Sequence, residues 1–123
     1  EMLAENPQDN STALRVAATL VRICFQLTQA GRLEEAIAVG EDAVAKMRAV
    51  GVKDPANAMV VTETTFGLTD LGLAYAKANR REKACALGKE AMVLLERPVR
   101  NALASSRGVK EKAKELVGMC GVK

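Results

Sequence analysis

The feature that most constrains this chain is an internal repeat of 48 residues. When the sequence is shifted against itself by 48 positions, eight of the 24 residues from 20 to 43 meet an identical residue. The identical pairs are Leu20/Leu68, Ala30/Ala78, Arg32/Arg80, Glu34/Glu82, Ala36/Ala84, Ala38/Ala86, Gly40/Gly88 and Ala43/Ala91. Pro7 falls on Pro55 at the same shift. Such a period is typical of one structural unit used twice, with the copies stacked so that each buries a face of its neighbour.

Composition indicates that this unit is helical. Alanine and the straight-chain charged residues dominate, whereas the aromatic residues are only Phe25, Phe66 and Tyr75. Residues of the first kind favour helices, and a β-sandwich or barrel with so few aromatics would be unusual. A chain of 123 residues fits one domain with one core. We therefore expect an all-α fold over residues 1–123, an α-α superhelix of antiparallel helix pairs with about five helices.

The ends of the expected helices are marked by proline, glycine and asparagine. Pro7 and Pro55 suit the first turn of a helix, and each follows a capping-type residue. Gly31 breaks the first helical pattern, and Asn79, which also adopts the left-handed turn conformation, stands at the equivalent place. Gly51 is expected to end the second helix. The predicted helices are 7–30, 33–50, 55–78 and 81–96.

After Pro98, apolar residues recur every three or four positions as far as Cys120, which predicts one further amphipathic helix over 98–121. It is either a cap on the stack, which we favour, or the first helix of a truncated third unit. Residues 97–123 hold seven basic and two acidic residues, a net of +5. Such a segment is typical of a solvated helix face and can also favour an acidic partner. On or near the face opposite the apolar one lie Arg100, Arg107, Lys110 and Lys114.

Both units resemble a tetratricopeptide repeat, closest to the long-period kinesin-light-chain type. In the second unit the matching residues are Leu71, Gly72, Leu73, Ala74, Tyr75, Asn79, Glu82, Lys83, Ala84, Gly88 and Ala91. In the first unit they are Ile23, Cys24, Leu27, Gly31, Leu33, Glu35, Ala36 and Ala43. The resemblance implies repeat units at 5–51 and 54–97 and a capping helix at 98–121.

This sequence departs from the family in period and in one large side chain. Its period of 48 residues exceeds the family's period of about 34, or about 42 in the kinesin-light-chain type. The large aromatic often seen in the second helix is Gly40 or Gly88 here. Either other residues fill that volume, or the helices pack closer together.

The resemblance implies a non-enzymatic adaptor or scaffold that binds a peptide or partner protein in a concave groove, formed by the first helix of each repeat. By motif position the groove residues would be Val21, Phe25, Thr28, Gln29, Phe66, Thr69, Leu73 and Lys77. Phe25 and Phe66 could instead pack against the extra helical turns. The family's clamp for a C-terminal carboxylate needs Lys and Asn where Val21 and Phe25 stand, which argues against that ligand.

Other functions find little support in the sequence. With no histidine and no nucleophile motif, we expect neither an enzyme nor a cofactor or metal. Cys24, Cys85 and Cys120 have no CxxC spacing and resemble small core residues, which favours a reducing, cytoplasmic compartment. No apolar run is long enough for a membrane span.

Two alternatives to the adaptor remain open from sequence. The exposed end of a short repeat stack could pair with a second copy, giving a homodimer. The basic last helix could bind nucleic acid or another acidic surface, although the scarcity of aromatic stacking partners argues against single-stranded nucleic acid.

Overall fold

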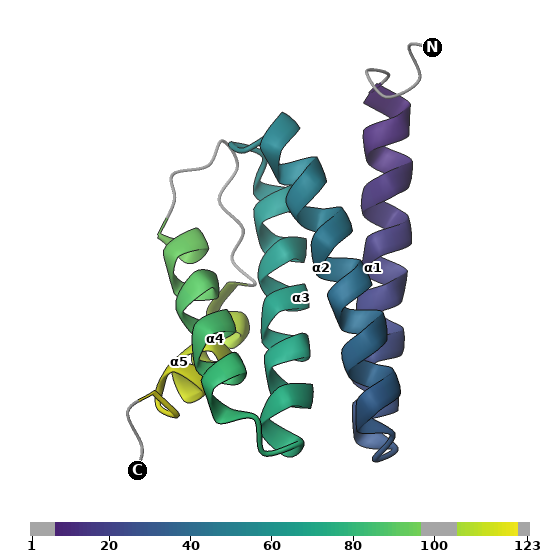
Figure 1. Cartoon of the computed structure of the whole chain (residues 1–123). Coiled ribbons are helices and arrows are strands. Elements are labelled where there is room, and N and C mark those ends of the chain that lie inside the picture. The colour runs from purple at the N-terminus through teal and green to yellow at the C-terminus, as the bar shows by residue number, and fades with distance from the viewer. Residues whose placement is uncertain (1–6, 97–105, 121–123) are drawn as a thin grey trace.

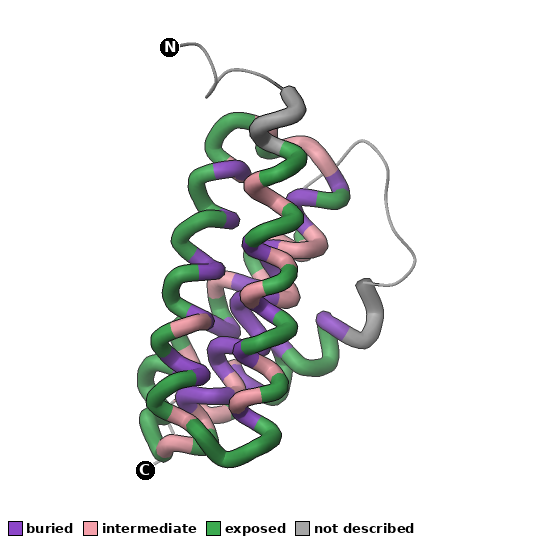
Figure 2. Tube along the Cα trace, turned by 90° about the vertical axis from the view of Figure 1, so that its right-hand side faces the viewer, coloured by how far each residue is buried: buried purple, intermediate pink, exposed green. Residues whose placement is uncertain are grey.

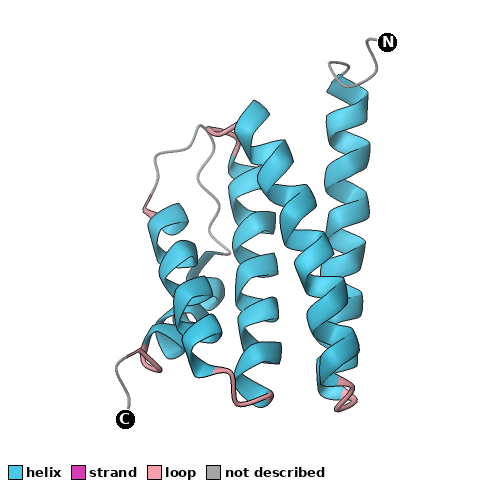
Figure 3. Cartoon of the chain, in the orientation of Figure 1, coloured by secondary structure: helices cyan, strands magenta, loops and turns pink. Residues whose placement is uncertain are grey.

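The computed structural model describes residues 7–96 and 106–120, and all regular structure in these residues is α-helix (Figure 3). The all-α prediction is therefore confirmed. Figure 1 shows the helices following one another across the molecule, from α1 at one edge to α4 and α5 at the other. The helices are α1 (Pro7–Gln29), α2 (Leu33–Lys53), α3 (Ala58–Lys77), α4 (Arg81–Leu95) and α5 (Ser106–Val117).

The helices contact one another in a regular pattern. Each helix packs against the next one along the chain, and in addition α1 packs against α3 and α3 against α5. Helix α5 thus contacts both α3 and α4, as α3 contacts both α1 and α2. Figure 2 shows that buried residues gather along the sides of the helices that face one another. This pattern is compatible with a helical repeat in which the first helices lie side by side.

The turns inside the two helix pairs are the same turn used twice. Gly31 has a φ of 81° and Asn79 a φ of 65°, the left-handed conformation predicted for both. In the first turn the amide of Arg32 donates to the carbonyl of Leu27 at 2.9 Å. In the second, 48 residues later, the amide of Arg80 donates to the carbonyl of Tyr75 at 2.8 Å. The repeat therefore holds for individual backbone hydrogen bonds.

Three predicted helix ends are wrong: two near the connection from α2 to α3, and the end of α5, which stops at Val117 and is followed by a turn over 118–120. Helix α2 continues through Gly51 to Lys53. Pro55 lies in a turn, and α3 begins only at Ala58. The cap is Asn57, whose side-chain oxygen accepts hydrogen bonds from the backbone amides of Met59 and Val60, at 2.9 and 3.4 Å. The side-chain nitrogen of Asn57 donates to the carboxylate of Asp54 at 2.9 Å. Asp54, the capping-type residue before Pro55, therefore orients Asn57, the residue that caps the helix.

The last predicted helix is shorter in the part of the chain that the structure describes. Helix α5 spans Ser106–Val117 and buries Val109, Ala113 and Leu116. The part of the prediction that covers 98–105 lies outside the described residues.

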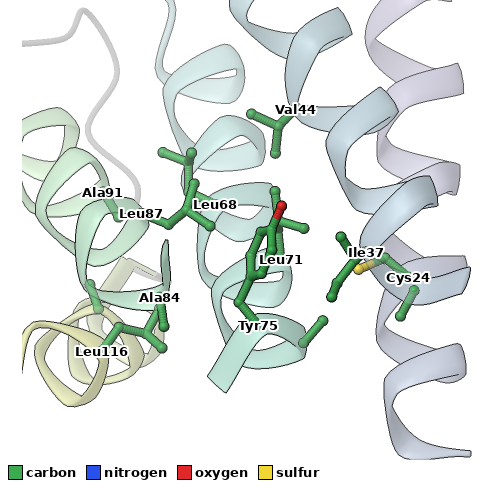
Figure 4. Close-up of a cluster of buried hydrophobic side chains, with 13 residues drawn as sticks. Cys24, Ile37, Val44, Leu68, Leu71, Tyr75, Ala84, Leu87, Ala91 and Leu116 are labelled. Atoms are coloured by element: carbon green, nitrogen blue, oxygen red, sulfur yellow. The ribbon is translucent and has the colours of Figure 1, made fainter. Parts of the chain in front are cut away.

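The buried core runs across the whole stack. Figure 4 shows it extending from Cys24 on α1 to Leu116 on α5. Tyr75 is buried, as its place in the repeat motif predicts, and its hydroxyl forms a hydrogen bond with Glu41 on α2. Burial and this carboxylate raise the pKa of the Tyr75 phenol to about 12.

A leucine from the following helix fills the space left at the first of the two glycines. A Cβ atom added at Gly40 on α2 would lie 2.8 Å from Cδ1 of Leu71 on α3 and 2.9 Å from Sγ of Cys24 on α1. Three helices therefore meet at this glycine. A side chain at position 40 would push α3 away from the first helix pair.

The second glycine repeats this contact one unit later. A Cβ added at Gly88 on α4 would lie 2.7 Å from Cβ of Leu116 on α5. One added at Gly72 on α3, the equivalent of Cys24, would lie 2.5 Å from Cδ1 of Leu116. Leu116 thus has the role that Leu71 has in the first unit, and both explanations offered for the missing aromatic are correct. Other residues occupy its volume, and the helices approach closely.

The cysteines do not all behave as predicted. Cys24 is free and buried, and burial, together with the nearby charge of Asp70, raises the pKa of its thiol to about 11. Cys85 on α4 and Cys120 just after α5 form a disulfide, with Cα atoms 5.1 Å apart. The prediction of small core thiols is therefore wrong for this pair. The cysteines no longer argue for a reducing compartment, and a cytoplasmic location stays a prediction.

Alanine substitutions at the glycines test the close approach of α4 and α5. We expect Gly88→Ala to lower the free energy of unfolding by about 1–3 kcal/mol. The reason is that the new methyl group would meet backbone atoms that cannot turn aside, the nitrogen of Val117 at 3.0 Å and the oxygen of Ala113 at 3.1 Å. Gly40→Ala should lower the free energy of unfolding by less, since the atoms nearest to its added Cβ belong to side chains. Urea denaturation measures both effects.

Gly51→Ala is the matched control, because it also lies in a helix but has no atom closer than 3.9 Å to the added Cβ. Helix propensity alone should make it more stable by about 0.5–1 kcal/mol. A Gly88→Ala protein as stable as Gly51→Ala would contradict the close approach.

Candidate partner-binding groove

The first helices of the two units and α5 border an open cavity of about 270 Å³. Helix α1 contributes three side chains to it, α3 two and α5 one. We call this cavity the α1/α3/α5 groove. It is lined by Arg22, Phe25, Gln26, Phe66, Asp70 and Lys112.

Five of the eight groove residues predicted from the motif keep some contact with solvent. Phe25, Phe66 and Leu73 are half-buried, and Gln29 and Lys77 are exposed. Of these, the two phenylalanines line the cavity. Gln29 and Lys77 occupy equivalent positions of the repeat, one helical turn beyond Phe25 and Leu73.

The other three predicted groove residues are buried, which corrects the prediction for them. Val21 packs toward Gly67, where an added Cβ would lie 3.3 Å from its Cγ2. The hydroxyl of Thr28 donates to the carbonyl of Cys24 at 2.8 Å, and that of Thr69 to the carbonyl of Phe66 at 3.1 Å. Their polar groups are used inside their own helices, so these side chains offer nothing to a partner.

Sequence reasoning missed four of the lining residues: Arg22, Gln26, Asp70 and Lys112. Arg22 and Asp70 are 48 residues apart, so the repeat itself places them on one face of equivalent helices. Their equivalent positions in the repeat could have identified both residues from the sequence. No sequence pattern places Lys112 there, because only the packing of α5 against α3 and α4 brings it to the groove.

Asp70 is the least ordinary residue of the groove. It is only 8% exposed, and within the described residues no hydrogen bond reaches its carboxylate. Burial raises the pKa of Asp70 to about 6, although the positive charge of Lys112 opposes this shift. A carboxylate that has lost water without gaining hydrogen bonds is destabilised in its charged form.

Lys112 connects α5 to the aromatic wall of the groove. Its Nζ lies 5.7 Å from the centroid of the Phe25 ring, within the range of a cation–π contact. The lysine is otherwise exposed. The groove therefore already holds one ammonium group, supplied by the protein itself.

The predicted basic face of the last helix is interrupted by acids. Lys110 and Lys114 are exposed on α5, but Glu111 and Glu115 are exposed on the same short helix. Arg100 and the side chain of Arg107 lie outside what the structure describes. The described part of α5 is thus a mixed surface, typical of a solvated helix.

A second cavity, of about 400 Å³, lies between α2, α3 and α4. Its lining is mainly apolar and includes Val60, Val61 and Leu94. The polar side chains at its edge are already paired, since Arg48 donates two hydrogen bonds to Glu90, at 2.9 and 2.6 Å. It offers a partner apolar contact without a free polar group to fix orientation.

Residues 7–96 and 106–120 contain neither a cluster of metal ligands nor a helix that could span a membrane. No three His, Cys, Asp or Glu side chains there are placed to hold a metal ion. Nor does any helix in these ranges have the length and apolar character needed to cross a membrane.

No protein-family model matches the chain, nor does any curated protein or solved structure.

The buried carboxyl of Asp70 makes stability depend on pH. Its pKa is about 6 in the folded protein, against an ordinary value of 3.8, so folding favours the neutral form. The free energy of unfolding therefore has its full value below about pH 4. It falls by on the order of 2–3 kcal/mol as the pH rises through 6, because the folded protein then loses the proton on Asp70. Asp70→Asn should therefore be more stable than wild type at pH 7.5, with a flatter profile between pH 4.5 and 7.5.

Urea unfolding across that pH range measures the effect. Glu63→Gln is the control, since it removes a half-buried carboxylate from the same helix. An Asp70→Asn profile parallel to that of wild type would show that Asp70 titrates normally.

Proposed function

We propose that this chain is a non-enzymatic adaptor or scaffold domain of tetratricopeptide-repeat type, and that it binds a peptide or partner protein in the α1/α3/α5 groove. The observation that carries the proposal is the position of Phe25 and Phe66. These half-buried rings come from the first helix of each unit and line the same cavity. Aromatic side chains that keep access to a cavity are the usual anchors of a binding surface.

The repeat type draws support from contacts that recur at the 48-residue period. The turn hydrogen bond at Arg32 recurs at Arg80. A leucine also packs on both equivalent glycines, Leu71 on Gly40 and Leu116 on Gly88, although the second leucine lies three residues before the position equivalent to Leu71. These are the features that let helix pairs stack at a fixed spacing. They support a repeat architecture of the kind that presents an extended binding face.

The size of the cavity suggests how a ligand would sit. A volume of about 270 Å³ suits one or two side chains, not a whole helix. The rest of a peptide would run along the neighbouring turns, past Leu73, Gln29 and Lys77. An extended or helical segment with one anchoring side chain fits this shape.

Selection from a displayed library of random peptides tests this function directly. We expect binders to emerge and to lose affinity by about tenfold or more in Phe25→Ala and in Phe66→Ala, since aromatic anchors dominate such surfaces. Val93→Ala is the control, because Val93 is 64% exposed on α4 and does not line the groove. Isothermal titration gives the affinities, and circular dichroism checks folding. Folded phenylalanine variants that bind as tightly as wild type would refute the groove.

A second candidate function, self-association, has an observation of its own. Val16 and Ile23 on α1 are 46% and 40% exposed, whereas their equivalents Thr64 and Leu71 on α3 are 6% and 0% exposed. The face that α3 buries against α2 is thus uncovered on α1. A second copy could cover it through a two-fold interface between α1 helices.

Sedimentation equilibrium tests this candidate. If the α1 face pairs two copies, wild type should dimerise at micromolar concentration and Ile23→Ser should stay monomeric, since it places a hydroxyl in the apolar contact. A wild-type monomer at all concentrations would exclude the dimer.

A further inference from the structure

We propose that the α1/α3/α5 groove takes a basic side chain, lysine or arginine, from the bound peptide, with Asp70 as its anionic contact and Phe25 and Phe66 as its aromatic walls. This inference rests on the proposed function and adds the chemistry of the residue that enters the cavity.

The first reason is the state of Asp70. It is the acidic member of the cavity lining, and it is more than nine-tenths buried. Buried polar groups in folded proteins normally have hydrogen-bond partners, yet none reaches this carboxylate within the described residues. A basic ligand would supply the N–H donors that Asp70 lacks, together with a positive charge closer than that of Lys112.

The second reason is that the groove already accommodates a cation. Lys112 extends from α5 to within 5.7 Å of the centre of the Phe25 ring. Its charge also acts on Asp70, where it opposes the rise in the pKa. The lysine is exposed and flexible, so it can move into water when another cation arrives. Lys112 thus marks where the basic group of a ligand would lie.

The competing ligand is an acidic side chain, which Arg22 and Lys112 would attract. Both of these cations are exposed, so water and salt weaken their electrostatic attraction for an acidic side chain. Asp70 is buried, and charges interact more strongly there. A second carboxylate in the cavity would face Asp70 in this poorly solvated place, so the observations favour a cation.

Four peptides that differ at one position provide the test. The first is acetyl-Ala-Leu-Lys-Leu-Ala-amide, and the others carry arginine, norleucine or glutamate in place of the lysine. Each is titrated into the ¹⁵N-labelled full chain at pH 7.5 and followed by NMR. We expect the lysine and arginine peptides to shift the amide signals of Phe25, Phe66 and Asp70. Their dissociation constants should be at least about tenfold lower than that of the glutamate peptide.

Two variants connect the preference to named groups. Asp70→Asn should abolish the preference for a basic peptide, because it removes the charge and keeps the shape. Lys112→Gln should lower the dissociation constant of the lysine peptide a few-fold, since the Lys112 ammonium group no longer competes with the peptide for the groove. Lys110→Gln, which makes the same change in net charge on the same helix outside the cavity lining, is the control and should have no effect.

The outcomes separate this proposal from the proposed function. If the glutamate peptide binds as tightly as the lysine peptide or tighter, or if a preference for lysine survives in Asp70→Asn, the groove binds peptides but not through a basic residue. If none of the four peptides shifts the groove signals, the basic-residue proposal is again overturned. The library selection then decides separately whether the groove binds peptides at all.

Discussion

The arrangement of this molecule depends on a close contact between a glycine on the second helix of a unit and a leucine on the next helix. Gly40 receives Leu71, and Gly88 receives Leu116. Because no side chain stands at the glycine, the next helix approaches both helices of the preceding pair. The same contact used twice sets α3 against α1 and α2, and then α5 against α3 and α4.

The groove is a consequence of this spacing. Helices α1, α3 and α5 all border the cavity, because α3 packs against α1 and α5 packs against α3. Arg22 and Asp70 reach it from the same position of the repeat, and Lys112 reaches it only because Leu116 fixes α5 nearby. A repeated packing contact thus brings together residues that are far apart in the sequence.

Asp70 shows the tension between stability and binding at this site. The buried carboxylate costs free energy near neutral pH. Proteins commonly retain such local conflicts where a ligand resolves them. The proposed basic residue would do so, because it would give Asp70 a close opposite charge and replace the hydrogen bonds to water that burial removed.

The features that could be predicted from the sequence are those that local conformational preferences determine. The left-handed turns at Gly31 and Asn79 and the helices on either side of them follow from local preferences and from the repeat. The start of α3 does not, because Asp54 and Asn57 are both good caps and only the packed structure selects Asn57. Gly51 likewise lies inside α2, which continues to Lys53.

The candidate site was predicted only in part, for similar reasons. Motif position identified Phe25 and Phe66, but the rotation of each helix about its axis depends on packing. That rotation buries Thr28 and Thr69 and brings Asp70 to the cavity instead. The Cys85–Cys120 disulfide and the place of Lys112 depend on how α5 docks, which local patterns do not encode.

The most direct test of this account is the contact of Leu116 in solution, measured by nuclear Overhauser effects in a methyl-labelled sample. We predict cross-peaks from the Leu116 δ-methyl groups to the α-protons of Gly72, and from the Leu116 β-protons to those of Gly88. The matching cross-peaks between Leu71 and Gly40 serve as the internal control. If the control peaks are present and Leu116 shows none to either glycine, α5 does not repeat the packing of α3, and the groove as described here does not form.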